Sequence, residues 1–592
     1  MGPRSSARIA PISAVLRARW WYAFILIVFG VFLLRLFYLQ VIRYGYYHKT
    51  ALSDQLKQYE IQPSRGVIYA HEGDSTVPIV LNEKLYTVYV DPTLIKASDR
   101  QKIADTLHDI LGGSTDDYVK DIQQQKTRYV ILAKRVAADK KDQLLKHKYP
   151  GIGAQEQDYR TYPQGDLASQ VLGFVNDSDS GVYGVEQALN KQLTGTPGEL
   201  KAVTDINGVP LAASNGNVQQ QPVAGDNVAL TVDAGMQKQL QQILQDGVQK
   251  AKSDSGSAII MDPNTGAIKA MANYPSYNPG DYQDVSDPSV FNNAAVSSPL
   301  EVGSIMKTLT SAAALDQGVV QENTTYNDPA HWEVDDFNIT NIEEDGGPGV
   351  KSIEDILNLS LNTGATWLLM QMGDPGGTTI NQKGRDAWYN YMVNHFQLGK
   401  ETGIEQGYES PGYIPNPDHG YGLDLTYANT AFGQGMTATP LQMAAALSAI
   451  VNGGTYYQPH LVDETISPDG TTTKTSPKVV KSNVVAPRVS GEMQSLMEGV
   501  VKGHYLHFPD QYSVGGKTGT AQIAKSGGGY YDNEFNGTYI GFVGGNTPQY
   551  VIIVRVNQPH NGGYAGTAAA QPIFVNAVNM LINDFGVTPK TH

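Results

Sequence analysis

The order of apolar and polar positions divides the chain into a short apolar segment and two longer folded parts. Trp20 to Leu39 is a run of 20 residues whose single charge is Arg35. An apolar helix of this length, at about 1.5 Å per residue, can cross a bilayer. One charge near its end can reach the membrane interface. We therefore expect a transmembrane helix over residues 20–42.

Basic residues before this segment predict its orientation. They are Arg4, Arg8, Arg17 and Arg19. Because positive charge is retained on the cytoplasmic side, residues 1–19 are expected to form a cytoplasmic tail, and the rest of the chain to lie on the outer face. A cleaved signal peptide is the competing interpretation, but no small-x-small cleavage site follows the apolar run.

Residues 43–222 mix strand-like and helix-like patterns without a catalytic signature. Strand alternation covers Tyr59–Ala70 and Val77–Val90, and helical patterns with serine N-caps cover Ser98–Leu111 and Ser114–Gln125. The polar stretch Asn215–Gln221 has no apolar period and predicts a domain boundary. The second domain is then expected to be residues 223–592.

Residues 223–592 have strand patterns at both ends and mainly helical patterns between them. The strand patterns are Asn227–Asp233, Ser257–Met261, Ala267–Ala272, Tyr512–Ile523, Gly537–Gly544 and Tyr550–Asn557. The helical patterns include Gly235–Lys250, Ser352–Leu359, Thr366–Met372 and Thr439–Ala449. This order predicts an α+β domain, in which both ends of the domain build one antiparallel sheet and an all-helical subdomain lies between them.

A candidate nucleophile and its base begin one of the helical patterns. The helix is expected to follow Gly303 and to stop at Gly318. Ser304 and Lys307 are three residues apart and so share one helix face, where the lysine amine can take the serine proton. A single Ser-x-x-Lys is a weak signal, because a buried helix start without a catalytic role has the same pattern.

Two further motifs strengthen this interpretation. Ser360-Leu361-Asn362 lies downstream, and Lys517-Thr518-Gly519-Thr520 follows it. A second Ser-x-Asn, at Ser276, precedes the nucleophile between two prolines and predicts a turn. The order Ser-x-x-Lys, Ser-x-Asn, Lys-Thr-Gly is that of the penicillin-recognising serine enzymes. Over nearly its whole length the chain resembles the class B penicillin-binding proteins, the membrane-anchored D,D-transpeptidases of bacterial cell-wall synthesis.

The chemistry of acyl transfer, together with this resemblance, implies a role for each residue of the first two motifs. Ser304 would be the nucleophile. Lys307 would be its base, because desolvation and neighbouring cations lower the pKa of a lysine. Ser360 would relay the proton, and Asn362 would orient Lys307 or the substrate amide.

The third motif would lie on an edge strand, Val514–Ala521, and bind the substrate. Lys517 would add positive potential, and the hydroxyls of Thr518 and Thr520, on either side of Gly519, would bind a terminal carboxylate. As the resemblance implies, the backbone N–H groups of Ser304 and Thr520 would form the oxyanion hole. No metal or organic cofactor is expected.

The chain departs from the family in one place and matches it in another. Val302-Gly303 stands where the family has Pro-Gly, so the helix entry lacks the fixed φ of proline. The run Phe432-Gly433-Gln434-Gly435 is similar to the family. Its alternative interpretation is an ordinary glycine-rich loop before a helix that starts with proline.

Three short runs in residues 43–222 resemble N-terminal signatures of the family. They contain Arg65, Arg160 and Glu186. The resemblance implies a pedestal (dimerisation-like) domain that holds the catalytic domain away from the membrane and contacts partner proteins. The three residues are candidates for a structural ion network, and ordinary surface charges are the alternative.

Composition excludes several other classes. With 592 residues the chain needs more than one domain. A net charge of −15 argues against a nucleic-acid partner. The absence of cysteine excludes thiolate catalysis and cysteine-ligated metals.

Other functions share the three motifs. They include D,D-carboxypeptidases, serine β-lactamases, membrane β-lactam sensors and catalytically silent wall scaffolds. A β-lactamase would need a deacylating base, for which Glu354 or another acid stays open. A sensor would need a cytoplasmic output that a 19-residue tail cannot supply.

The resemblance also implies partners. The chain would act on donor and acceptor peptidoglycan stem peptides and bind β-lactams. No glycosyltransferase domain fits before residue 223, so a membrane glycosyltransferase of the shape, elongation, division and sporulation family would polymerise the glycan. Other divisome or elongasome proteins would join it. The compact C-terminal region favours the septal type over the elongation type.

Overall fold

The computed structural model describes residues 14–46, 56–203, 218–342, 347–525 and 527–591. Contacts divide the chain into two compact units, residues 1–63 with 196–223, and residues 64–195 with 224–592. Arg4 and Arg8, on which the expected orientation partly depends, lie outside the described residues. So do residues 215–217 of the polar boundary stretch.

The smaller unit contains the apolar helix and a short sheet. Helix α1 (Ala14–Phe37) continues into a π-helical turn, Tyr38–Ile42. Within them, Arg19–Ile42 is long and apolar enough to cross a membrane, and none of it is buried against the described protein. The sheet has the order β1 (Leu56–Ile61), β8 (Gly198–Val203), β9 (Val218–Gln220). The expected span thus coincides with a suitable helix.

The larger unit begins with a seven-stranded sheet. Its path is β19 (Thr472–Lys474), β18 (Val462–Ile466), β10 (Asn227–Asp233), β2 (Ile68–Glu72), β3 (Ser75–Val90) and β4 (Val130–Val136), and β5 (Ile152–Thr161) also pairs with β3. Strands from both sides of residue 223 therefore share one sheet. β2 and β10 run parallel with Ile68 beside Val228, which ties the N-terminal strands to the C-terminal domain.

Two details of the N-terminal elements differ from the expectation. Tyr59–Ala70 was expected as one strand, but β1 ends at Ile61 and β2 begins at Ile68. Helix α3 (Arg100–Leu111) has Asp99 at its N-cap, with no side-chain capping bond, so the expected cap at Ser98 is wrong. In contrast, Ser114 accepts the Asp117 N–H at 3.4 Å and caps α4 (Thr115–Ile122) as expected.

The second sheet is built from both ends of the C-terminal domain, as the strand patterns predicted. Its antiparallel order is β12 (Ile268–Tyr274), β11 (Ser255–Met261), β23 (Pro548–Asn557), β22 (Tyr530–Gly544) and β21 (Ser513–Ala524). The α+β prediction is confirmed, and β21, which carries Lys517, is an edge strand.

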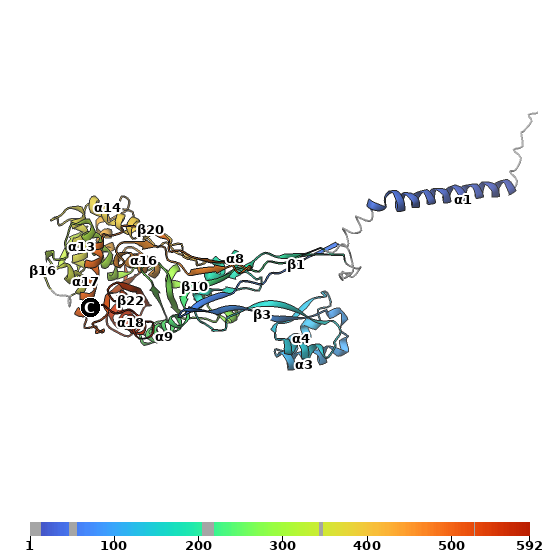
Figure 1. The fold of residues 1–592 in the computed structure, drawn as a ribbon, viewed down its shortest axis with the longest axis horizontal. Coiled ribbons are helices and arrows are strands. Elements are labelled where there is room, and N and C mark those ends of the chain that lie inside the picture. The colour runs from blue at the N-terminus through green and yellow to red at the C-terminus, as the bar shows by residue number, and fades with distance from the viewer. Residues whose placement is uncertain (1–13, 47–55, 204–217, 343–346, 526, 592) are drawn as a thin grey trace, which may run out of the picture. The chain divides into compact units, whose positions relative to one another are not determined.

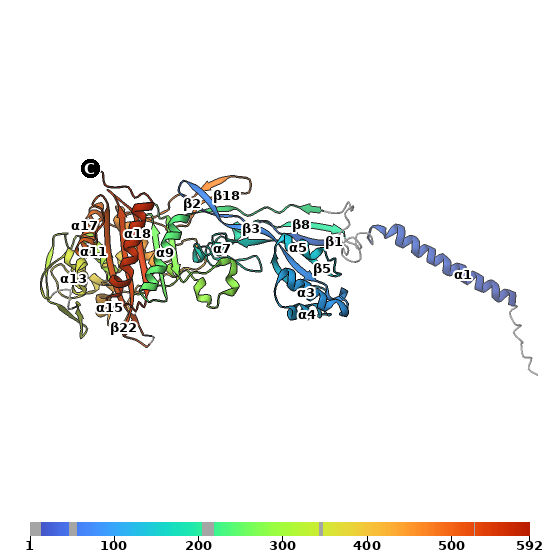
Figure 2. The ribbon, with the colours of Figure 1, turned by 90° about the horizontal axis from the view of Figure 1, so that it is seen from below.

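Alternating side chains give this sheet two buried faces. Ala258 and Ile260 join a core that includes α9 (Ala234–Lys250) and α18 (Gln571–Asp584), which pack side by side (Figures 1 and 2). Ile259 and Met261 join the larger core on the other face, which contains the helical subdomain.

The helical subdomain lies in sequence between the two groups of strands, as expected, and the patterns at 304–318, 352–359, 366–372 and 439–449 coincide with four of its helices. Its helices are α11 (Met306–Gln317), α12 (Ile353–Asn358), α13 (Asn362–Gly373), α14 (Gln382–Asn390), α15 (Leu423–Thr430), α16 (Pro440–Val451) and α17 (Pro487–Gly503). Ser352 and Thr439 begin α12 and α16 with reciprocal capping boxes. α11 packs against α13 and α17, which brings the Ser304 segment beside the other two motifs.

Candidate active site

Ser304 lies at the entry to the central helix of the subdomain. A 3-10 turn, Gly303–Ile305, leads into α11, and Gly318 ends the helix in the left-handed region at φ +75°. Gly303 also has a positive φ, +64°, and a Cβ there would lie 2.8 Å from the Thr520 carbonyl oxygen. Glycine is required because the backbone before Ser304 crosses closely over β21.

The Lys307 amine is fully buried and reaches two of the motifs. Its Nζ lies 2.9 Å from Ser304 Oγ, 2.5 Å and 3.2 Å from the carbonyl oxygen and Oγ of Ser360, and 2.8 Å from Asn362 Oδ1. All four neighbours are uncharged oxygens. The amine is thus within hydrogen-bond distance of two hydroxyl groups, the distance that proton transfer between a lysine and a serine requires.

Ser360 links the two lysines. It occupies the left-handed region at φ +58°, between α12 and α13, and its Oγ also accepts from Lys517 Nζ at 3.1 Å. A non-glycine residue held in this conformation carries strain that surrounding contacts must offset. Asn362 Nδ2 donates to the Thr340 carbonyl at 3.0 Å, which fixes the amide whose oxygen faces Lys307.

The third motif presents a buried cation and two hydroxyls on the edge strand. Lys517 is fully buried, and its Nζ donates to the Thr518 carbonyl at 3.0 Å. A Cβ on Gly519 would lie 2.3 Å from Thr538 Oγ1, so this position admits only glycine. Thr520 Oγ1 accepts the Gly566 N–H at 3.0 Å and still has a proton to donate.

The three motifs meet in a cavity of about 240 Å³. Ser304, Ser360, Asn362, Thr518 and Thr520 line it. Lining residues that the motifs did not identify are Ile342, Asn358, Leu359, Phe432, Gln434, His504, Tyr564 and Thr567. The family-like glycine-rich run contained two of them, Phe432 and Gln434, and Asn358 and Leu359 end the helical pattern 352–359, but no sequence motif marked the others as lining residues.

The fold and the geometry of this cavity define the class of protein. An antiparallel sheet with a helical subdomain, and Ser-x-x-Lys, Ser-x-Asn and Lys-Thr-Gly in one cavity at the sheet's edge, are the features of the penicillin-recognising serine enzymes. The comparisons with known proteins agree. The family model "Penicillin binding protein transpeptidase domain" matches residues 256–579, and "Penicillin-binding Protein dimerisation domain" matches residues 60–230. The chain therefore belongs to the penicillin-binding proteins and contains their transpeptidase domain.

Individual relatives cover almost the whole chain. Stage V sporulation protein D of Bacillus subtilis is 30% identical over 98% of this chain and 88% of its own. Peptidoglycan D,D-transpeptidase FtsI of Escherichia coli is 28% identical over 95% of this chain and 91% of its own. The crystal structure of penicillin binding protein 2X from Streptococcus thermophilus shares the fold, with a TM-score of 0.69 and 22% identity over 90% of this chain and 83% of that chain.

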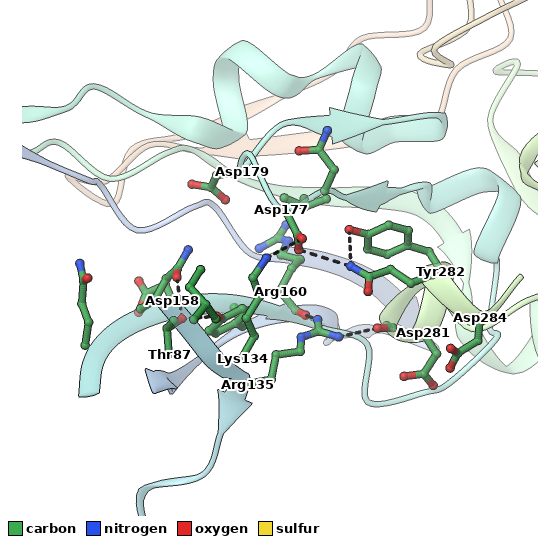
Figure 3. A pocket seen from close by; sticks show the side chains of 18 of the residues that line it. Thr87, Lys134, Arg135, Asp158, Arg160, Asp177, Asp179, Asp281, Tyr282 and Asp284 are labelled. Atoms are coloured by element: carbon green, nitrogen blue, oxygen red, sulfur yellow. Dashed lines mark hydrogen bonds and ion pairs between the residues drawn. The ribbon is translucent and has the colours of Figure 1, made fainter. Parts of the chain in front are cut away.

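A larger cavity, about 320 Å³, shares no residue with the motif cavity. It lies between β3, β4 and β5 and the 280–284 segment (Figure 3). Among its lining residues, Lys134 pairs with Asp177 at 2.6 Å, and Arg135 donates to the Gly280 carbonyl. None of the three motifs contributes a residue to the described lining of this larger cavity.

The three candidate network residues, Arg65, Arg160 and Glu186, meet in the interior of the larger unit. Nε of Arg65 and Nε of Arg160 each donate to the Glu186 carboxylate at 2.7 Å. The exposed fractions of these side chains are 4%, 3% and 0%. Arg160 Nη1 also donates to Asn82 Oδ1 at 2.9 Å, and Arg65 Nη1 donates to Thr194 Oγ1 at 2.7 Å. The network joins segments distant in sequence.

Glu186→Gln is expected to lower the free energy of unfolding by about 3–5 kcal/mol, because two buried guanidinium groups would lose their shared countercharge. Thermal melts of the full-length protein would measure this loss. Glu156→Gln is the control, since Glu156 pairs with Lys84 on the surface and its loss should leave the melt unchanged. Equal melts for the wild type and Glu186→Gln would contradict a structural role for the network.

Proposed function

We propose that this chain is a membrane-anchored D,D-transpeptidase that cross-links peptidoglycan stem peptides through an acyl-enzyme on Ser304, and that β-lactams acylate the same serine. The observation that carries this proposal is the position of Lys307 Nζ, within hydrogen-bond distance of both Ser304 Oγ and Ser360 Oγ. Transpeptidase relatives that match nearly the whole chain support it.

The geometry supports an acylation step as follows. The neutral Lys307 amine takes the Ser304 proton while Oγ attacks the carbonyl carbon of the penultimate D-alanine. The N–H groups of Ser304 and Thr520 stabilise the resulting oxyanion. When the intermediate collapses, the C–N bond breaks, and Ser360 relays the proton from Lys307 to the departing D-alanine amine.

Deacylation repeats these steps with an acceptor amine as the nucleophile. The amine attacks the acyl-enzyme ester and gives up a proton, the ester C–O bond breaks, and Ser304 regains its proton. In the preceding acylation step, before the terminal D-alanine leaves, Lys517, Thr518 and Thr520 hold its carboxylate and fix the direction of the donor along β21. The product is a new amide bond between two stem peptides.

The lining of the cavity favours a transpeptidase over a β-lactamase. Among the described lining residues none is acidic, so none of them can activate water as a carboxylate base. Glu354, left open by the sequence, directs its carboxylate toward Gly499 on α17 and does not line the cavity.

Fluorescent-penicillin labelling of the detergent-solubilised full-length protein tests the proposal. A transpeptidase should form a long-lived covalent adduct. A protein that consumes penicillin catalytically would be a hydrolase, and a protein that never forms an adduct would be a silent scaffold.

The proposed organisation is a cytoplasmic tail (1–19), a membrane anchor (20–42), a pedestal (43–222) and a transpeptidase domain (223–592), with the last two on the outer face. The apolar helix and the dimerisation-domain match support this division. The similarity to Stage V sporulation protein D and to FtsI supports a septal role. Its partner in this proposal is a membrane glycosyltransferase of the shape, elongation, division and sporulation family.

Removal of residues 1–50 is expected to release the protein from membranes while it keeps penicillin labelling, because the one described helix suited to a span is then absent. Membrane fractionation measures the first effect, and labelling of the soluble fraction measures the second. In protoplasts, added protease should digest the full-length protein down to its tail. Protection of the large domains would reverse the proposed topology.

A further inference from the structure

The Glu301 carboxylate, three residues before the nucleophile, has no part in the scheme above. Its Oε1 accepts the Gly435 N–H at 2.9 Å and the Tyr530 hydroxyl at 3.0 Å. Its Oε2 is buried and has no hydrogen-bond partner in the described part of the chain. Burial raises the pKa of the Glu301 carboxyl, against the two hydrogen bonds, which lower it. A buried carboxylate oxygen without a hydrogen bond costs free energy. Its presence three residues before the nucleophile therefore needs an explanation.

The two donors belong to two different segments that neighbour residues 301–304. Gly435 ends the 432–435 run, which supplies Phe432 and Gln434 to the cavity wall. Tyr530 begins β22, the partner of the strand that carries Lys517. The Glu301 side chain therefore joins the nucleophile segment to both neighbours through one oxygen atom.

The 433–435 segment contacts the nucleophile segment directly through its backbone. The Gly303 N–H donates to the Gly433 carbonyl at 3.0 Å. A Cβ on Gly433 would lie 2.2 Å from the Gly303 carbonyl oxygen. Because the two segments touch without intervening side chains, a shift of the 433–435 backbone would move the residue before Ser304.

Hydrogen bonds to neighbouring segments hold the backbone at Val302, where the family has a proline. Val302 has φ −81° and ψ −14°, values that its own side chain does not enforce. Its carbonyl accepts from Thr538 Oγ1 at 2.9 Å, and the adjacent Glu301 is held by Gly435 and Tyr530. The direction of the chain into α11 is thus set by hydrogen bonds to neighbouring segments.

We propose that Glu301 is a positioning residue, whose Oε1 fastens the 433–435 segment and Tyr530 to the nucleophile segment and so aligns Ser304 Oγ for attack. The inference rests on the proposed role of Ser304 as the nucleophile. Misplacement of a reacting atom by about 1 Å can cost about 100-fold in rate. Loss of the acceptor should therefore slow acylation without weakening the initial binding of the acylating compound.

Stopped-flow acylation of the full-length protein by a chromogenic β-lactam separates these effects. Glu301→Ala should lower the first-order acylation rate constant about 10–100-fold and leave the dissociation constant of the non-covalent complex unchanged. Glu301→Gln keeps an acceptor oxygen and should stay within a few-fold of the wild type. Tyr530→Phe should cause a smaller loss, and Glu301→Ala with Tyr530→Phe should be no slower than Glu301→Ala alone.

Glu409→Ala is the matched control. Glu409 is a buried glutamate whose carboxylate, like that of Glu301, accepts two hydrogen bonds, here from the backbone N–H groups of Thr402 and Gly403 at 2.7 and 2.9 Å. Burial raises the pKa of its carboxyl too. It holds a segment that does not line the cavity, so its loss should lower the melting temperature but not the acylation rate constant.

Three results would overturn the inference. They are a wild-type acylation rate in Glu301→Ala, an equally slow Glu301→Gln, and an equal loss of rate in Glu409→Ala. If the wild-type protein itself forms no adduct, the proposed function fails instead.

Discussion

Ser304→Ala is expected to abolish covalent labelling by fluorescent penicillin and to leave the thermal melt close to that of the wild type. The hydroxyl of Ser304 lies 2.9 Å from the proposed base, and no other step in the scheme can form the acyl bond. Alanine keeps the small volume at the start of α11, so the fold should persist. Gel fluorescence measures the labelling, and mass spectrometry of the wild-type adduct peptide locates the acylated residue.

Ser311→Ala provides the control on the same helix. Ser311 is fully buried, and its Oγ has no hydrogen-bond partner among the described residues. This variant should label like the wild type. An adduct on a serine other than Ser304, or persistent labelling of Ser304→Ala, would refute the assignment of the nucleophile.

Lys307→Arg should acylate about 10²–10⁴-fold more slowly than the wild type, the usual contribution of general-base catalysis. A guanidinium does not deprotonate at working pH, so it cannot take the Ser304 proton even though it keeps the positive charge. Pre-steady-state acylation across a pH series is the measurement. The wild-type rate should rise with pH as the Lys307 amine becomes neutral, and the residual rate of the variant should not follow that rise.

Lys517→Arg is the companion variant. The proposed role of Lys517 needs a cation but no proton transfer. The acylation rate of Lys517→Arg should therefore fall clearly less than that of Lys307→Arg, and thermal melts check that both variants fold. The reverse order, an active Lys307→Arg and an inactive Lys517→Arg, would mean that the two lysine roles are exchanged.

Local patterns predicted the strands of the second sheet and several helices because their signals are short in range. A turn between two apolar runs identified β11 and β12, β-rich runs identified β22 and β23, and Ser352 and Thr439 sit at the caps of α12 and α16 where helices were expected. The error at Tyr59–Ala70 lies in the break between the two strands. Residues 62–67 contain Pro63 and Gly66, which interrupt a strand pattern, and there the chain leaves one sheet and enters another.

The sequence by itself determined the three motifs, their order, the class of chemistry that they imply and the apolar segment at the N-terminus, because residue type and spacing within one helix turn or strand carry that information. It named Arg65, Arg160 and Glu186 but could not establish that they touch. Only the tertiary structure decided that these charges share one buried site, that Ser360 lies between two lysines, and that Glu301 fastens two segments to the nucleophile. Such contacts join residues many positions apart, and they form only when packing of the sheets and helices brings their backbones together.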